Sequence, residues 1–264
     1  THGHLIKWKA GRFIGAGKMG QVIKAMDSES GKIFAVKRLF FNPNIPEQAE
    51  FVQCLEDEID LLKSLKHPHI VQYLGSERVA ESLCVYLEYM AGGSIASILQ
   101  NYGQLEERTI QVYTKQILRG LAYLHGKQVV HRDIKGQNIL VDTDGTVKLA
   151  DFGCSKKINS SVSSSEMITS IKGSIPWMAP EVVAQKGHGR KADIWAMGCT
   201  VIEMASADNP WGHFDNHIAA IMKIAKSNDL PAIPDHLSEK CKDFIISCLH
   251  RNPQHRPSAS DLLQ

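Results

Sequence analysis

The feature that most constrains the fold of this chain is the stretch HRDIKGQNILVDTDGTVKLADFG at residues 131–153. It contains two apolar runs, at 139–141 and 147–149, joined by Asp-Thr-Asp-Gly. Two apolar runs on either side of an Asp-Gly turn predict a β-hairpin. Asn138 comes directly before this hairpin and Asp151 shortly after it, so we expect the two side chains to lie at the same end.

Amide and carboxylate oxygens at one end of a hairpin are suitable ligands for Mg²⁺, which takes few protein oxygens and is often completed by phosphate. Asp133 and Lys135 lie just upstream and add a carboxylate and a cation. Phosphoryl transfer requires a metal, a cation and a carboxylate that receives the hydroxyl proton. Each piece alone is common in surface turns, but the order and spacing of all four favour this chemistry.

A glycine-rich segment, Gly-Ala-Gly-Lys-Met-Gly at residues 15–20, lies between two runs with strand character. A dinucleotide-binding motif of this form opens a helix, whereas here a strand pattern follows, from Val22 onward. A Walker loop is excluded because Met19, and not Ser or Thr, follows Lys18. The segment therefore predicts a hairpin whose backbone amides approach phosphate groups.

Together these motifs resemble those of protein kinase catalytic domains of the serine/threonine kind, since Lys135 stands where tyrosine kinases usually carry Ala-Ala-Arg. The resemblance extends from about Trp8 to Leu263. It implies an α+β, two-lobed fold, with an antiparallel sheet and one main helix in a small N-lobe and a mostly helical C-lobe. The expected protein kinase domain covers 1–264, divided into an N-lobe at 1–87, a hinge at 88–93 and a C-lobe at 94–264.

The resemblance also implies ATP and Mg²⁺ as cofactors and assigns roles to individual residues. Asp133 and Lys135 are the expected catalytic residues of the loop, with Asn138 and Asp151 as metal ligands. Lys37 is expected to contact the α- and β-phosphates and to pair with Glu58, on a helix predicted at 48–64, although Glu56 is a competing partner. The implied nucleotide-binding residues are Gly15, Ala16, Gly17, Gly20, Val22, Ala35, Lys37, Leu87, Glu88, Met90 and Leu140.

At finer grain the chain resembles the mitogen-activated protein kinase kinase kinases, on the segments HRDIKGQN (131–138), WMAPE (177–181) and GCTVIEM (198–204). This implies a mitogen-activated protein kinase kinase as substrate and either an upstream activator or autophosphorylation. A kinase of the p21-activated or germinal-centre kind is one alternative, because those families share the first two segments. A nucleotide-binding pseudokinase scaffold is the other.

The C-lobe is expected to contain a helix at 109–124 and further structural residues. Asp193 resembles an aspartate that anchors the backbone of the catalytic loop, and Arg256 resembles an arginine that pairs with Glu181. The run Gly173-Ser174-Ile175-Pro176-Trp177 departs from the Gly-Thr-Pro-Tyr-Trp that is common in the family.

A serine-rich run at 160–170 lies between the Asp-Phe-Gly and Ala-Pro-Glu motifs and is expected to be an activation segment. Ser170, with Thr169 beside it, is the expected regulatory phosphosite, because a phosphate there adds negative charge for Arg132 and Lys156 to bind. Cys154 is expected to be a small buried side chain without a catalytic part.

Composition limits the classes of partner. Lys and Arg number 30 against 28 Asp and Glu, and no basic block is present, which argues against nucleic acid as a partner. The six cysteines contain no Cys-x-x-Cys pair, which favours a reducing, cytoplasmic setting. The apolar stretch at 196–207 is interrupted by Glu203 and predicts a buried helix and not a membrane span.

Overall fold

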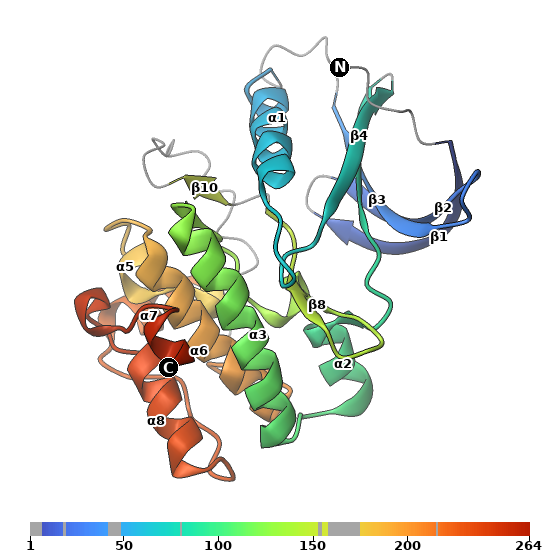
Figure 1. Ribbon diagram of the computed structural model, residues 1–264. Coiled ribbons are helices and arrows are strands. Elements are labelled where there is room, and N and C mark those ends of the chain that lie inside the picture. The colour runs from blue at the N-terminus through green and yellow to red at the C-terminus, as the bar shows by residue number, and fades with distance from the viewer. Residues whose placement is uncertain are drawn as a thin grey trace. The chain divides into compact units, whose positions relative to one another are not determined.

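The computed structural model describes residues 7–17, 20–41, 49–79, 81–152, 155–157, 175–214 and 216–264 (Figure 1). The chain divides into two compact units, Thr1–Ala91 and Gly92–Gln264. The first is built around an antiparallel sheet and the second mainly from helices. The expected hinge at 88–93 includes the point of division and remains a prediction.

The sheet of the first unit has five antiparallel strands in the spatial order β1-β2-β3-β5-β4. One face carries a core of Ala25, Phe34, Val36, Cys84 and Tyr86, all nearly inaccessible to solvent. Alternating side chains of a strand point to opposite faces, so this core leaves the other face of the sheet for different residues. The strands are β1 (Trp8–Gly17), β2 (Gly20–Asp27), β3 (Ile33–Phe40), β4 (Tyr73–Val79) and β5 (Ser82–Glu88).

Helix α1 (Ala49–Ser64) lies beside this sheet (Figure 1) and agrees with the helix predicted at 48–64. Leu55, Ile59 and Leu62 recur at intervals of three and four residues and are buried. Asp57 and Asp60 are exposed. The helix is therefore amphipathic, and burial of its apolar stripe fixes its rotation.

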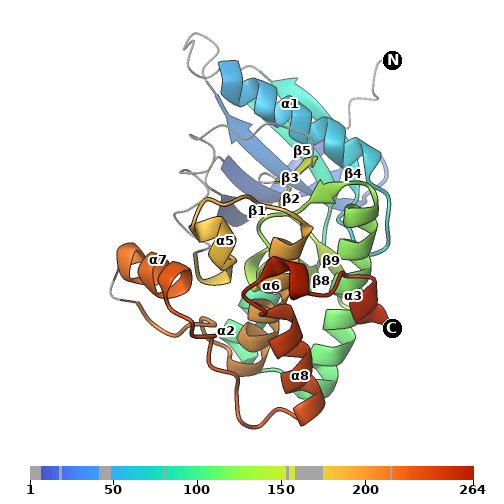
Figure 2. The same ribbon diagram turned by 90° about the vertical axis from the view of Figure 1, so that its left-hand side faces the viewer.

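The second unit is organised around α6 (Arg190–Ser206), which contacts α3 and α8 (Figure 2). Residues 192–205 of this helix are all buried. A helix that is buried on all sides lies in the interior of a unit, as the apolar stretch at 196–207 predicted. The other helices are α2 (Ile95–Tyr102), α3 (Glu107–Gly126), α5 (Pro180–Val183), α7 (His217–Lys226) and α8 (Glu239–Cys248).

The hairpin predicted from residues 139–149 is present as β8 (Ile139–Val141) and β9 (Val147–Leu149), and β8 also pairs with β6 (Gly93–Ser94). Ile139 pairs with Leu149 at its open end. The turn uses Gly145 at φ 80°, a conformation that favours glycine. Gln116 of α3 secures the turn, since its amide nitrogen donates to Gly145 O at 3.0 Å and its oxygen accepts from Val147 N at 2.8 Å.

Short elements complete the second unit. They are β7 (Val129–Val130), β10 (Lys156–Lys157) and the 3₁₀ turns η2 (Gly136–Asn138), η3 (Ile175–Trp177), η4 (Pro253–His255) and η5 (Asp261–Leu263). Within the described part of the chain, no helix combines the length and the apolar character needed to cross a membrane.

Candidate active site

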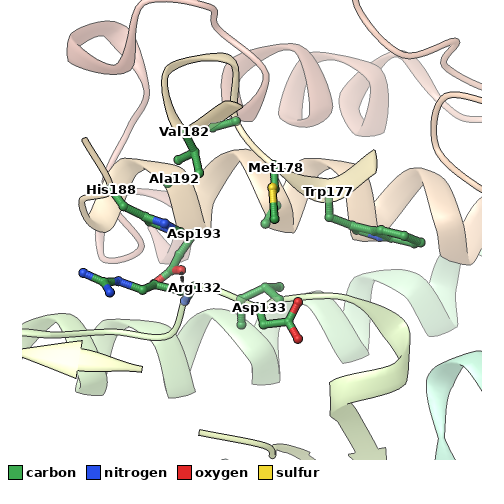
Figure 3. A pocket seen from close by; sticks show the side chains of 11 residues that line it. Arg132, Asp133, Trp177, Met178, Val182, His188, Ala192 and Asp193 are labelled. Atoms are coloured by element: carbon green, nitrogen blue, oxygen red, sulfur yellow. Dashed lines mark hydrogen bonds between the residues drawn. The ribbon is translucent and has the colours of Figure 1, made fainter. Parts of the chain in front are cut away.

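The start of the loop that follows β7 is held by the buried carboxylate of Asp193 on α6. One carboxylate oxygen accepts from the backbone nitrogen of His131 at 2.9 Å. The other accepts from the backbone nitrogen of Arg132, also at 2.9 Å (Figure 3). Nε2 of His125 contacts the first oxygen at 2.8 Å. Arg132 has φ 73°, an unfavourable conformation for a residue with a side chain, and these bonds help to stabilise it.

Burial and hydrogen bonds shift the pKa values of Asp193 and of His131 beside it. Burial alone would raise the pKa of Asp193, but the hydrogen bond with His125 helps to hold it below the ordinary value. Burial lowers the pKa of His131 and favours its neutral ring. Nδ1 of that ring accepts from Asp133 N at 3.3 Å, so Nε2 carries the proton and donates to Ala150 O at 3.1 Å. His131 thus connects the loop to the residue that precedes Asp151.

Asp133, Lys135 and Asn138 converge in this loop. Nζ of Lys135 lies 3.0 Å from Oδ2 of Asp133, and both side chains are largely buried. Nδ2 of Asn138 donates to the same oxygen at 2.7 Å and to Asp133 O at 2.8 Å. The Asp133 carboxylate is therefore oriented by one cation and one amide.

Asn138 and Asp151 lie at the same end of the hairpin, as the sequence predicted. The ladder continues one step beyond Ile139 and Leu149, because Ala150 N donates to Asn138 O at 2.9 Å. Asp151 follows directly, with φ 58° and an exposed side chain. Since Nδ2 of Asn138 is engaged by Asp133, its amide oxygen is the atom suited to a cation.

In the first unit, Nζ of Lys37 on β3 lies 3.3 Å from Oε1 of Glu58 on α1. Of the two partners considered, Glu58 is the one that the structure places at Lys37, whereas Glu56 is exposed. The side chains are 20% and 12% exposed, so the ion pair is partly shielded from water.

Several of the expected nucleotide-binding residues share one face of the sheet with Lys37. Val22 pairs with Lys37, and Ala35 pairs with Leu87 two residues along the same strand. Directly paired residues of antiparallel strands point to the same face, and so do alternate residues of one strand. This face is opposite to the one that carries the Phe34–Tyr86 core.

The glycine-rich hairpin joins β1 and β2, with Gly17 paired with Gly20 and Gly15 with Val22. A Cβ atom on Gly20 would lie 2.0 Å from Arg38 O, so this glycine is required by the close approach of β3. A Cβ on Gly15 would meet nothing within 4 Å, which leaves its surroundings open. Ala16 lies between them on β1 and pairs with Gln21.

The remaining predicted residues lie at strand ends and in the second unit. Glu88 ends β5 and pairs with Phe34, and Met90 follows it and is buried. Leu140 lies on β8, pairs with Ser94 and Lys148, and belongs to the second unit. Ser170, Thr169, Ser174 and Cys154 lie outside the described residues, and of Lys156 only its backbone pairing with Val130 is described.

The segment that includes η3 and the residues after it lies next to the loop. One small pocket is lined by side chains of both, namely Arg132, Asp133, Trp177, Met178 and His188 (Figure 3). Burial lowers the pKa of His188 to about 4. Glu181, at the start of α5, forms the predicted pair with Arg256, with two contacts of 2.7 and 2.8 Å.

Sequence reasoning missed the residues that orient this site from outside the motifs. Gln116 is an ordinary member of the predicted helix at 109–124 and His125 directly follows it, and nothing in their spacing marked them. Glu203 gave a usable signal, because an acidic residue inside a buried apolar helix requires hydrogen-bond partners. Those partners are Gly136 N and the indole nitrogen of Trp177.

The comparisons with known proteins agree with this geometry. The model of the protein kinase domain matches residues 8–264. Mitogen-activated protein kinase kinase kinase 3 of Arabidopsis thaliana is 52% identical over 97% of this chain and 42% of its own length. Mitogen-activated protein kinase kinase kinase A of Dictyostelium discoideum is 45% identical over 99% of this chain and 28% of its own length. Mitogen-activated protein kinase kinase kinase 3 of Homo sapiens is 44% identical over 98% of this chain and 41% of its own length.

The chain spans less than half the length of these relatives. The predicted resemblance and the predicted two-lobed α+β class are both confirmed by the family match. The family uses ATP and a divalent metal in general. This chain belongs to the protein kinase family and is similar to the mitogen-activated protein kinase kinase kinases.

Proposed function

We propose that this chain is a serine/threonine protein kinase that transfers the γ-phosphoryl group of ATP to protein hydroxyls. The observation that carries the proposal is the convergence on Asp133, whose Oδ2 lies 3.0 Å from Nζ of Lys135 and 2.7 Å from Nδ2 of Asn138. A carboxylate held in this way can receive the hydroxyl proton while the substrate oxygen attacks the γ-phosphorus. The bond from phosphorus to the β–γ bridging oxygen then breaks, and ADP leaves.

The other residues of the site have supporting roles in this proposal. Lys135 steadies the γ-phosphate, and Lys37, oriented by Glu58, holds the α- and β-phosphates. The adenine base is bound by the backbone of Glu88 and Met90 between Val22, Ala35 and Leu140, with Leu87 behind it. Gly15, Ala16, Gly17 and Gly20 provide the backbone that covers the phosphates.

Asn138 and Asp151 fit Mg²⁺ because both offer oxygen atoms at the same end of the hairpin. The described residues contain no cluster of three or more His, Cys, Asp or Glu side chains that could hold a metal. The two oxygens therefore need phosphate oxygens to complete the site, as expected for a metal that arrives with a nucleotide. When bound, Mg²⁺ neutralises the charge of the phosphates.

The proposed substrate is a mitogen-activated protein kinase kinase, which is supported by the names of the relatives. Gln137 is neutral, so strong selection of basic peptides is not expected. The proposed control is phosphorylation of Ser170 or Thr169 by an upstream activator or by the chain itself, bound by Arg132 and Lys156. The near balance of positive and negative charges supports protein partners and not nucleic acid. The free cysteines support a cytoplasmic setting.

The test is transfer of radiolabelled phosphate from ATP to a panel of purified kinase kinases by the wild-type chain and by Asp133→Asn. We expect the variant to lose about 10²- to 10⁴-fold in rate, the usual contribution of a positioned general base. Equal rates in both proteins would remove Asp133 from its role. Binding of ATP without transfer by the wild type would favour a scaffold, and transfer to broader targets than kinase kinases would favour a p21-activated-like enzyme.

A further inference from the structure

Two histidines that follow α8 form a close pair and have no part in the proposed phosphoryl transfer. His250 lies two residues after the end of α8, and His255 ends η4. Nε2 of His250 is 3.3 Å from Nδ1 of His255, and the ring centroids are 4.5 Å apart. Both residues are exposed, so neither ring fills a core. The pair is therefore accessible to a ligand from water.

The spacing of these two nitrogens matches that of a tetrahedral metal site. Two nitrogens bound to one Zn²⁺ at about 2.0–2.1 Å lie about 3.3–3.4 Å apart when the coordination is tetrahedral. The 3.3 Å between Nε2 of His250 and Nδ1 of His255 lies in this range. Without a metal the same approach is a hydrogen bond, in which one nitrogen carries a proton. A metal takes the place of that proton once the rings turn and both lone pairs converge, and exposed side chains turn rapidly.

The backbone of the turn that carries the pair is fixed by local hydrogen bonds. Oδ1 of Asn252 accepts from Gln254 N at 3.0 Å, and His255 N donates to Asn252 O at 3.1 Å. Pro253 begins η4, where its restricted φ suits the turn. The backbone positions of the pair are therefore set in advance, and a metal ion has to order only the two exposed rings.

The second ring nitrogen of His250 has a suitable partner for the metal-bound state. Nδ1 of His250 lies 3.3 Å from Asn252 O and 3.2 Å from Asn252 N. When Nδ1 carries the proton it donates to the carbonyl oxygen, and Nε2 then presents a lone pair toward His255. Metal-binding histidines usually donate their other N–H to such an acceptor, which fixes the tautomer. A metal would thus select a tautomer whose hydrogen-bond acceptor is already in place.

Two arginines belong to the same turn, but their guanidinium groups bind other acceptors. Arg251 donates to two backbone carbonyl oxygens, at 2.6 and 2.8 Å. Arg256 holds the carboxylate of Glu181, and its Nε also donates to His250 O at 2.7 Å. The turn that a metal would clamp is therefore the turn that holds Arg256 in its buried ion pair.

We propose that His250 and His255 bind one divalent transition-metal ion of the Zn²⁺ kind, with water at the remaining positions. Among the described residues no third His, Cys, Asp or Glu completes a metal cluster with them, so the pair supplies both protein ligands. Imidazole suits Zn²⁺, Ni²⁺ and Cu²⁺, whereas Mg²⁺ prefers oxygen. The site therefore differs in chemistry from the proposed Mg²⁺ position at Asn138 and Asp151, and it does not rest on phosphoryl transfer.

The test is titration of the 264-residue chain with Zn²⁺ alone, in the absence of nucleotide. Calorimetry gives affinity and stoichiometry, and NMR spectra of the histidine rings identify which rings respond. His250→Gln, His255→Gln and the double variant remove imidazole from exposed positions and keep the backbone bonds of the turn. His69→Gln is the matched control. Its ring neighbours that of His67, but the centroids are 5.6 Å apart and Nδ1 of His67 accepts from His69 N at 3.1 Å.

We expect saturating Zn²⁺ to shift the ring signals of both His250 and His255. Each single variant should bind Zn²⁺ at this site about 10- to 100-fold more weakly or worse, since loss of an outer partner alone has that effect. The double variant should be little weaker than either single variant, because one remaining ring cannot chelate. His69→Gln should keep the wild-type affinity, and Mg²⁺ should leave the two ring signals unshifted.

Thermal denaturation provides a second measurement. The change in Tm on addition of Zn²⁺ should be more positive for the wild type than for the double variant, because only the wild type binds the ion at this turn in its folded state. Equal affinity in the wild type and the double variant, or losses that add between the single variants, would overturn the shared site. Ring signals of His250 and His255 that do not respond to Zn²⁺ would overturn it as well. These outcomes are independent of transfer activity, so the proposed function and the metal site fail separately.

Discussion

Arg256 is almost fully buried, and all three of its guanidinium nitrogens donate hydrogen bonds. Two of these nitrogens hold the Glu181 carboxylate at 2.7 and 2.8 Å, and the guanidinium lies over the ring of Trp195, 5.1 Å from its centroid. Removal of one partner from a buried ion pair leaves the other charge uncompensated. We therefore expect Arg256→Ala to reduce the free energy of unfolding by about 3–5 kcal/mol, measured by urea denaturation.

The matched control at the same scale is Lys63→Ala. Lys63 pairs with Asp60 at 2.9 Å on the surface of α1, where both side chains are at least half exposed. Exposed pairs of this kind contribute about 0.5 kcal/mol or less, so the control should be nearly neutral. If Arg256→Ala were no more destabilising than Lys63→Ala, the buried pair would not stabilise this unit.

At the scale of elements, Gln116 connects α3 to the β8–β9 hairpin through two side-chain hydrogen bonds. Gln116→Leu removes both bonds to the backbone of Gly145 and Val147. We expect a loss of stability of about 1–3 kcal/mol from the unsatisfied backbone groups, faster exchange of the Val147 amide, and a raised KM for the metal–nucleotide complex. The last effect follows because the hairpin carries Asn138 and Asp151 at its far end.

Gln53→Leu is the control for this prediction, since Gln53 contacts only the exposed Asp57 on the surface of α1 among the hydrogen bonds described. It should change stability by less than about 0.5 kcal/mol. An unaltered KM and an unaltered Val147 amide in Gln116→Leu would show that the hairpin holds its shape without α3.

The elements themselves were largely predictable from the sequence, because local patterns determine them. The hairpin at 139–149 followed from its Asp-Gly turn, and α1 from its apolar spacing. Near the C-terminal end, residues 261–263 form only the 3₁₀ turn η5, whose start is held by Ser258 and Asp261. Hydrogen bonds of single side chains compete there with a helix that is too short to stabilise itself.

The site was predictable only in part, for a physical reason. Its motif residues are close in sequence, so spacing suffices to bring Asp133, Lys135 and Asn138 together. The groups that orient them, at Asp193 and Glu203, come from 60 or more residues away. The positive φ of Arg132 likewise depends on the Asp193 anchor and has no local sequence signal. Such contacts are decided by tertiary packing, which local patterns do not specify.

At the scale of the whole molecule, protonation of the 12 histidines changes a net charge that is only +2 when they are neutral. Two of them, His131 and His188, have their pKa lowered by burial, the latter to about 4. His188 lines the pocket that also contains Arg132, Asp133 and Asp193 (Figure 3). A proton on His188 would therefore lie near both positively and negatively charged side chains. The folded chain therefore keeps these two rings neutral at pH values where the unfolded chain protonates them.

The sign of the resulting pH dependence follows from linkage. An unfolded histidine titrates near pH 6.5, whereas folded His188 titrates near 4, so between these values the unfolded state binds more protons. Stability should fall as the pH is lowered from 7 to 5, with about 1–2 kcal/mol of the loss due to His188. Urea denaturation of wild type and His188→Asn at both pH values measures this contribution.

The variant should lose correspondingly less stability between pH 7 and 5, whatever its stability at pH 7, because an asparagine does not titrate. His213→Asn, which replaces an exposed histidine, is the matched control variant. Below pH 4 a further loss is expected from Asp193, whose lowered pKa means that its stabilising contribution disappears as the pH falls through its folded value. An equal drop between pH 7 and 5 in wild type and His188→Asn would show that His188 is protonated as readily in the folded as in the unfolded chain.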